Sequence, residues 1–239
     1  MKPTRRIATF ALVLVSTICS VAVFAQWNKK PYTEWSEKEA QKMLDDSPWG
    51  QTQTFSDTSQ AFDTGRRADS GQSRVADVSH TNFRIRFLSA TPVRQAFSRI
   101  IELKQKEAMS DQLAAQLKAF VTPGGFPDFV VISVNVDSRE QRAQLQQATV
   151  LLQTRTTAEL KNNTYLLVKG GQRVFIQEFQ TPKRDGLGAK FIFPRMVEGK
   201  PYITEASGEV QFYSELSKDY TLNMRFKVKE MMFDGKLEY

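Results

Sequence analysis

The chain contains one cysteine, Cys19, and one histidine, His80, among its 239 residues. Cys19 lies in the apolar N-terminal segment, so a chain from which that segment is removed has no thiol for nucleophilic catalysis or for a disulfide. One imidazole cannot supply the several histidine ligands of a common zinc site. These absences exclude cysteine catalysis and histidine-based metal binding for the processed chain, whose stability has to come from an apolar core.

Sequence motifs for other chemistries are also missing. No Gly-x-Ser-x-Gly elbow occurs, and a serine nucleophile would have to recruit His80 from a polar segment. Residues 186–188 (Gly-Leu-Gly) begin like a dinucleotide fingerprint, but the third glycine position holds Phe191 and the residues that follow are strand-like. We identify no catalytic, cofactor-binding or metal-binding residue and expect no cofactor. Paired carboxylates for glycoside hydrolysis stay open, because such pairs form in space; the candidates are Glu178, Glu205, Glu209 and Glu215.

The charge balance is only mildly basic. The whole chain carries a net charge of +7, and without residues 1–25 it has 30 basic and 26 acidic residues, a net charge of +4. The basic residues form no cluster of the kind that marks a nucleic-acid interface. We therefore expect no nucleic-acid partner.

The first 25 residues have the three-part layout of a secretory signal peptide. Lys2, Arg5 and Arg6 precede an apolar run over residues 7–24, and residues 23–25 (Val-Phe-Ala) form a small-x-small cleavage pattern before Gln26. We expect cleavage there and a periplasmic or extracellular product without a further membrane-spanning segment. The run is also just long enough to serve as an uncleaved anchor, which would make the protein a membrane-tethered one.

Residues 26–49 are predicted to form a helical arm. Ser36 and Glu39 have the spacing of a capping box, and Pro48 stops the helix near residue 46. A helix this short has to dock on the rest of the chain. Its neighbouring tryptophans Trp27, Trp35 and Trp49 either pin the arm to the body or form an exposed platform for a carbohydrate or a partner.

The remainder divides into a polar linker or loop, residues 50–82, and a globular domain, residues 83–239. Phe83, Ile85 and Phe87 alternate with Arg84 and Arg86, the pattern of a half-buried strand whose arginines face outward. Helical periodicity predicts helices over residues 92–121, and β-rich segments follow at residues 128–136 and 149–239. Asp234-Gly235 is a hairpin turn, and Tyr239 is expected to be buried at a sheet edge. The predicted class is α+β: a helical N-terminal half followed by an antiparallel, sandwich-like, β-rich C-terminal half.

Three segments, residues 35–49, 92–96 and 186–195, resemble a group of secreted bacterial proteins without an assigned activity. The resemblance implies export by a bacterium with an envelope, and it implies no catalytic residue or ligand. Our leading hypothesis is an exported, non-enzymatic binding or structural module whose partner is an envelope or secreted protein or a glycan. Its candidate partner-binding residues are Trp27, Trp35, Trp49, Arg84 and Arg86. The alternative is an exported hydrolase that uses carboxylates, such as a glycosidase.

Overall fold

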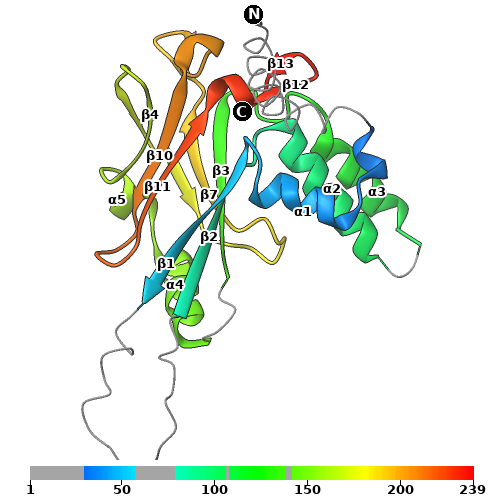
Figure 1. The fold of residues 1–239 in the computed structure, drawn as a ribbon, viewed down its shortest axis with the longest axis horizontal. Coiled ribbons are helices and arrows are strands. Elements are labelled where there is room, and N and C mark those ends of the chain that lie inside the picture. The colour runs from blue at the N-terminus through cyan, green and yellow to red at the C-terminus, as the bar shows by residue number, and fades with distance from the viewer. Residues whose placement is uncertain (1–29, 58–78, 106–107, 138–141) are drawn as a thin grey trace, which may run out of the picture.

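Two antiparallel sheets form the centre of the fold (Figure 1). The computed structural model describes residues 30–57, 79–105, 108–137 and 142–239. The larger sheet has five strands in the order β1 (Gly50–Asp57), β2 (Ser79–Phe87), β3 (Phe129–Asp137), β7 (Ala189–Pro194) and β6 (Glu178–Gln180). The smaller sheet has four, in the order β11 (Thr221–Lys227), β10 (Glu209–Glu215), β4 (Thr164–Val168) and β5 (Arg173–Phe175). Two short ribbons pair β12 (Met232–Phe233) with β13 (Lys236–Leu237), and β8 (Met196–Val197) with β9 (Lys200–Pro201).

The helices lie outside this pair of sheets. Figure 1 shows α1 (Glu37–Asp45), α2 (Thr91–Lys104) and α3 (Asp111–Val121) gathered on one side. The others are α4 (Arg142–Thr154), α5 (Thr157–Leu160) and the short 3₁₀ turns η2 (Tyr32–Glu34), η4 (Glu205–Ser207) and η5 (Val228–Glu230). In the part of the chain that the structure describes, no helix combines the length and the apolar character needed to cross a bilayer. The predicted α+β class is confirmed, although β1 and β2 separate α1 from α2, so helices and strands alternate along the chain.

The core lies between the two sheets. The predicted alternation on β2 is confirmed, because Phe83, Ile85 and Phe87 are fully buried. Rings from the larger sheet meet rings from the smaller one edge to face: Phe87 and Phe226 have centroids 4.9 Å apart. Each such side chain contributes about 1.5–3 kcal/mol on burial. The period-two pattern therefore decides which face of each strand forms the core.

The edge strands β1 and β11 lie next to each other, but the described strands include no backbone ladder between them. Glutamine side chains cross the seam instead. Gln51 Nε2 donates to the carbonyl oxygen of Arg225 at 3.2 Å, and Gln53 Nε2 donates to that of Thr221 at 2.9 Å. Gln53 Oε1 also accepts from the Asn223 N–H at 2.8 Å. The side chains thus occupy polar groups that an open sheet edge would leave unpaired.

The predicted arm helix is confirmed as α1, with its capping box. Glu39 N–H donates to Ser36 Oγ at 3.3 Å, and Ser36 N–H donates to Glu39 Oε2 at 2.8 Å. Trp35 and Trp49 flank the helix and are each 1% exposed. Trp49 Nε1 donates to the carbonyl oxygen of Glu238 at 2.7 Å. The arm is therefore joined to the last residues of the chain by core packing and by a hydrogen bond.

The C-terminal hairpin also matches its prediction. Asp234 and Gly235 join β12 to β13 with φ angles of 49° and 74°, the left-handed backbone of a primed turn. Tyr239 is buried, and the guanidinium of Arg195 lies 4.3 Å from the centre of its ring. The side chain of Glu238 accepts from the Thr91 N–H at 2.9 Å, which caps the N-terminus of α2.

The predicted linker over residues 50–82 is wrong at both of its ends. Residues 50–57 form β1, and β2 already begins at Ser79; residues 58–78 lie outside the described part of the chain. Strand β1 has little apolar character of its own, with Phe55 as its large apolar side chain. It becomes a strand because it pairs along its whole length with β2, from Gly50 opposite Arg86 to Asp57 opposite Ser79. A tertiary pairing of this kind leaves no periodic signal in the strand's own sequence.

The sequence predicts extended structure over residues 149–160, but these residues form the C-terminal part of α4 and all of α5. Ala148 and Leu152, four residues apart on one face of α4, are buried, and Thr156 and Glu159 form a capping box that starts α5. These features outweigh the β propensity of the valine and threonine residues there. Within the predicted β-rich segment 149–239, two short strands that lie close together in the sequence, β5 and β6, belong to different sheets.

The capping box makes α1 sensitive to pH. Hydrogen bonds from the Ser36 hydroxyl and backbone, followed by Lys30, lower the pKa of Glu39 from 4.5 to about 2. Because the folded pKa is depressed, this stabilisation is complete above the unfolded pKa and is lost as the pH falls toward 2. We predict that Glu39→Gln lowers the free energy of unfolding by about 0.5 kcal/mol at pH 7 and by nothing near pH 2, because the side chain is partly exposed.

The measurement is urea unfolding of the full chain at a series of pH values. Glu37→Gln removes the same charge from the same helical turn without touching the cap, and serves as the matched control. A Glu39→Gln effect that is equal at pH 7 and pH 2 would contradict the prediction.

Candidate functional site

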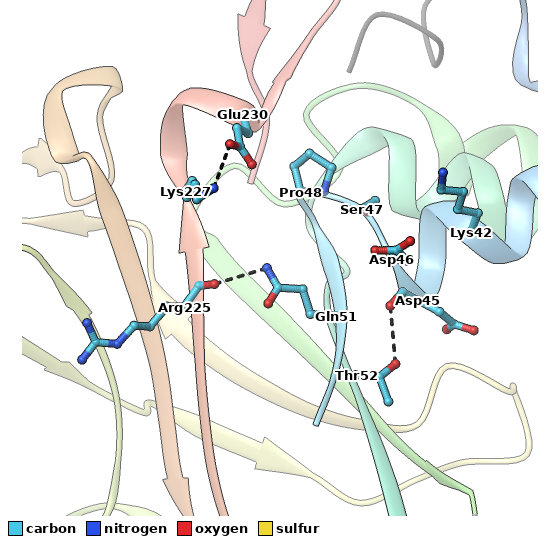
Figure 2. Close-up of a pocket in the computed structure, with 10 residues that line it drawn as sticks. All are labelled: Lys42, Asp45, Asp46, Ser47, Pro48, Gln51, Thr52, Arg225, Lys227 and Glu230. Carbon is cyan, nitrogen blue, oxygen red and sulfur yellow. Dashed lines mark hydrogen bonds and ion pairs between the residues drawn. The ribbon is translucent and has the colours of Figure 1, made fainter. Parts of the chain in front are cut away.

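A groove of about 680 Å³ lies between the C-terminal end of α1 and strand β11 (Figure 2). One wall comes from the turn between α1 and β1, and the other from β11 and η5. The lining residues are Lys42, Asp45, Asp46, Ser47, Pro48, Gln51, Thr52, Arg225, Lys227 and Glu230. Three of them are basic and three are acidic, and none is aromatic. The groove therefore suits a polar ligand that carries charge.

A tight helix-to-strand turn shapes the first wall. Ser47 Oγ donates to the carbonyl oxygen of Met43 at 2.6 Å and accepts from the Gly50 N–H at 3.1 Å. A Cβ atom on Gly50 would lie 2.2 Å from the carbonyl oxygen of Leu44, so only glycine permits the strand to start this close to the helix. The turn fixes the acidic end of α1 at the wall of the groove.

Two arginines of β2 hold the carboxylate of Asp45. Arg84 Nη1 donates to Asp45 Oδ2 at 2.7 Å, and Arg86 Nη2 donates to Oδ1 at 2.8 Å. Arg86 also donates from Nε to the carbonyl oxygen of Leu44 at 2.8 Å and from Nη1 to Asn135 Oδ1 at 2.7 Å. Both oxygens of Asp45 are thus engaged in holding α1 against the larger sheet.

Arg86 is 3% exposed, and its guanidinium lies 5.4 Å from the centre of the Phe97 ring. Burial lowers the pKa of Arg86, while the hydrogen bond and the negative charge of Asp45 raise it. A guanidinium removed from water needs such compensation, because an unpaired buried charge is strongly destabilising. The ion pair with Asp45 is therefore a structural element of the groove wall.

The opposite wall carries exposed charges. The side chains of Arg225 and Lys227 are 63% and 62% exposed. Arg225 pairs with Glu209 at 3.1 Å and Lys227 with Glu230 at 3.2 Å. Exposed pairs contribute little to stability, so these side chains can exchange their partners for a ligand at small cost. Figure 2 shows the guanidinium of Arg225 directed away from the groove, with its carbonyl oxygen facing Gln51.

The chemistry open to the groove is limited by its lining. It contains no thiol or imidazole, and the hydroxyls of Ser47 and Thr52 are hydrogen-bonded to backbone carbonyl oxygens of α1. Across the described ranges, no group of three acidic, histidine or cysteine side chains is arranged to hold a metal ion. Carboxylates and lysine amines are the lining groups with acid–base chemistry, and the carboxylate of Asp45 is occupied.

The candidate partner-binding residues from the sequence do not form one surface. Trp27 lies outside the described residues, and Trp35 and Trp49 belong to the core. Arg84 and Arg86 point away from the interior of the sheets as expected, but α1 covers them. The buried positions of Trp35, Trp49 and Arg86 favour a structural role over a binding role for these three residues.

The candidate carboxylates from the sequence also lie apart from the groove. Glu209 is paired with Arg225, Glu178 accepts from Gln180, and Glu205 and Glu215 lie at the start of η4 and the end of β10. The groove acids instead lie at the end of α1 and in η5, in the lining segments 45–48 and 225–230. The helix-stop signal at Ser47-Pro48 marks the segment 45–48 in the sequence. No sequence signal predicts that the segment 225–230 lies next to it.

Comparisons with known proteins provide no relative for this chain. No family model matches it, no curated protein matches it, and no solved structure matches it. Function is therefore argued from the residues of this chain alone.

The buried pair predicts an unequal response at two adjacent aspartates. We expect Asp45→Asn to lower the free energy of unfolding by about 3 kcal/mol, because it leaves the buried Arg86 without its counter-charge. Asp46→Asn, an exposed neighbour with the same change of charge, should cost less than about 0.5 kcal/mol. Urea unfolding of the full chain measures both values. Equal losses for the two variants would show that the pair does not stabilise the fold.

Proposed function

We propose that this protein is an exported, non-enzymatic binding module of the bacterial envelope or the secreted space, and that it takes a polar partner in the groove. The partner class is an envelope or secreted protein or a glycan. Support for export comes from residues 1–25, with their basic start, apolar run and cleavage pattern. That segment lies outside the residues described by the structure.

Support for binding without catalysis comes above all from Asp45. Its two oxygens are held by Arg84 and Arg86, so the central acid of the groove serves the structure. At the rim, the side chain of Lys227 is 62% exposed and pairs with Glu230 at 3.2 Å, so it is able to exchange this partner for a ligand. A groove with fixed polar walls and exposed charges of both signs suits recognition of a charged, polar surface.

The proposal of export makes a testable prediction. The full chain, expressed in a bacterium with two membranes, should be recovered from the periplasm or the medium with Gln26 as its first residue, because the pattern before it favours cleavage by signal peptidase. Intact-mass measurement and N-terminal sequencing read the result. An unprocessed chain in the membrane fraction would favour the anchored form, and an unprocessed chain in the cytoplasm would contradict export.

The proposal of binding in the groove makes a separate prediction. Lys42 and Lys227 lie on opposite walls, so Lys42→Glu combined with Lys227→Glu reverses the cationic charge there. We expect this double variant to retain at least tenfold less of the partner that the unchanged chain captures from envelope and secreted fractions. Lys161→Glu combined with Lys218→Glu makes the same change in exposed turns outside the groove and should have no effect. Equal capture by both variants would contradict a groove site.

The carboxylate-dependent hydrolase remains the alternative, because Asp45, Asp46 and Glu230 line the same groove. The same fractions distinguish it from binding. A glycan that the unchanged chain cleaves, and that Asp46→Asn or Glu230→Gln leaves intact, would replace the binding proposal with this one.

A further inference from the structure

The outer face of the smaller sheet carries a row of aromatic rings. Strand pairing places Phe175 opposite Tyr165, Tyr165 opposite Tyr213, and Tyr213 opposite Asn223. Their neighbours along the strands, Val174, Leu166, Phe212 and Leu222, are buried in the core, so these four side chains face outward. The row therefore crosses all four strands of the sheet on the side away from the core.

The rings pack against one another. Tyr165 and Tyr213 are stacked, with centroids 4.9 Å apart and planes 15° apart. Tyr165 meets Phe175 edge to face at 5.9 Å. Phe175 is nevertheless 43% exposed, on a face that antiparallel sheets usually fill with polar side chains when it meets water.

The next row of the same face is cationic and polar. Arg225, Gln211, Leu167 and Arg173 lie opposite one another across the strands. The guanidinium of Arg173 lies 4.5 Å from the centre of the Tyr165 ring, and Gln211 Nε2 donates to Asn223 Oδ1 at 2.6 Å. Lys169 continues the face just after β4, beside Glu209. The two rows thus bring rings, amides and cations together.

The charge of this face is not balanced. Glu209 pairs with Arg225, whereas no carboxylate of the described residues forms an ion pair with Arg173 or with Lys169, and both side chains are exposed. An anionic partner would complement these two cations. The amides of Gln211 and Asn223 are suited to hydrogen-bond hydroxyl groups, and the electron-rich faces of the rings attract the C–H groups of a sugar ring.

We propose that this face binds an anionic polysaccharide, a chain of sugar rings bearing carboxylates or phosphates. Sugar rings pack against the exposed ring of Phe175 and the half-buried ring of Tyr213, which the buried Tyr165 holds in place, and the anionic groups pair with Arg173 and Lys169. The ring row lies apart from the groove; Arg225 and Lys227 of β11 line the groove and also lie on this face, so the variants that test the row are placed on β5. A polyhydroxylated chain is favoured over a lipid surface because the row is flanked by the amides of Gln211 and Asn223, which suit hydroxyl groups.

The experiment measures binding of the full chain, recovered after export, to a linear polyuronate and to a neutral linear glucan by titration calorimetry. Binding of the polyuronate, with at least tenfold weaker binding of the glucan and loss of affinity in higher salt, is expected. Phe175→Ala and Arg173→Gln should each raise the Kd by at least fivefold. Met196→Ala and Lys161→Gln remove an exposed apolar group and an exposed cation elsewhere and should leave the Kd unchanged.

A groove variant away from this face, Lys42→Glu alone, should keep its affinity for the polyuronate, which distinguishes failure of this site from failure of the groove. Circular dichroism and urea unfolding verify that each variant is folded. Absence of polyuronate binding, or equal Kd values for Phe175→Ala and Met196→Ala, would overturn the proposal. Tighter binding to polyglutamate or to phosphatidylglycerol vesicles, reduced by the same two variants, would also overturn it in favour of an acidic peptide or a membrane.

Discussion

The burial of Arg86 under α1 is the constraint on which the rest of the arrangement depends. Its guanidinium is nearly inaccessible to water and donates to three acceptors, Asp45, the Leu44 carbonyl oxygen and Asn135, while the ring of Phe97 adds a cation–π contact. These groups come from the end of α1, from β3 and from α2. Because a buried cation tolerates few geometries, α1 has one position on the larger sheet. The end of that helix then defines one wall of the groove.

Contacts between the two ends of the chain complete this framework. Trp49 and Thr91 both donate to Glu238, the first to its carbonyl oxygen and the second to its side chain, while Arg195 donates to the carbonyl oxygen of Tyr239. The last residues therefore connect the arm, the start of α2 and the end of β7. At the seam between the two sheets, the side chains of Gln51 and Gln53, rather than a backbone ladder, join β1 to β11. The groove lies where this seam meets the α1 turn.

The two proposed surfaces differ in how their charges are used. In the groove, three acids and three bases line the walls and the exposed pairs are weak. On the outer face of the smaller sheet, cations accompany stacked rings and amides. The first surface favours recognition of a mixed-charge partner and the second favours an anionic chain with flat apolar faces. An exported binding module with both surfaces would hold a glycan on the outer face of the smaller sheet and a polar partner in the groove.

Local sequence determined the elements whose signals lie within a few residues: the capping box at Ser36 and Glu39, the period-two strand β2 and the Asp234-Gly235 turn. Where the signal was weak, at β1, or divided, as in α4 and α5, tertiary pairing and burial decided the outcome. Sequence also determined that Arg84 and Arg86 point away from the core, because strand side chains alternate. Only the tertiary structure decided that α1 covers them, and that segments 45–48 and 225–230 meet at one groove. Such contacts depend on how strands and helices pack across long sequence separations, and no local pattern encodes them.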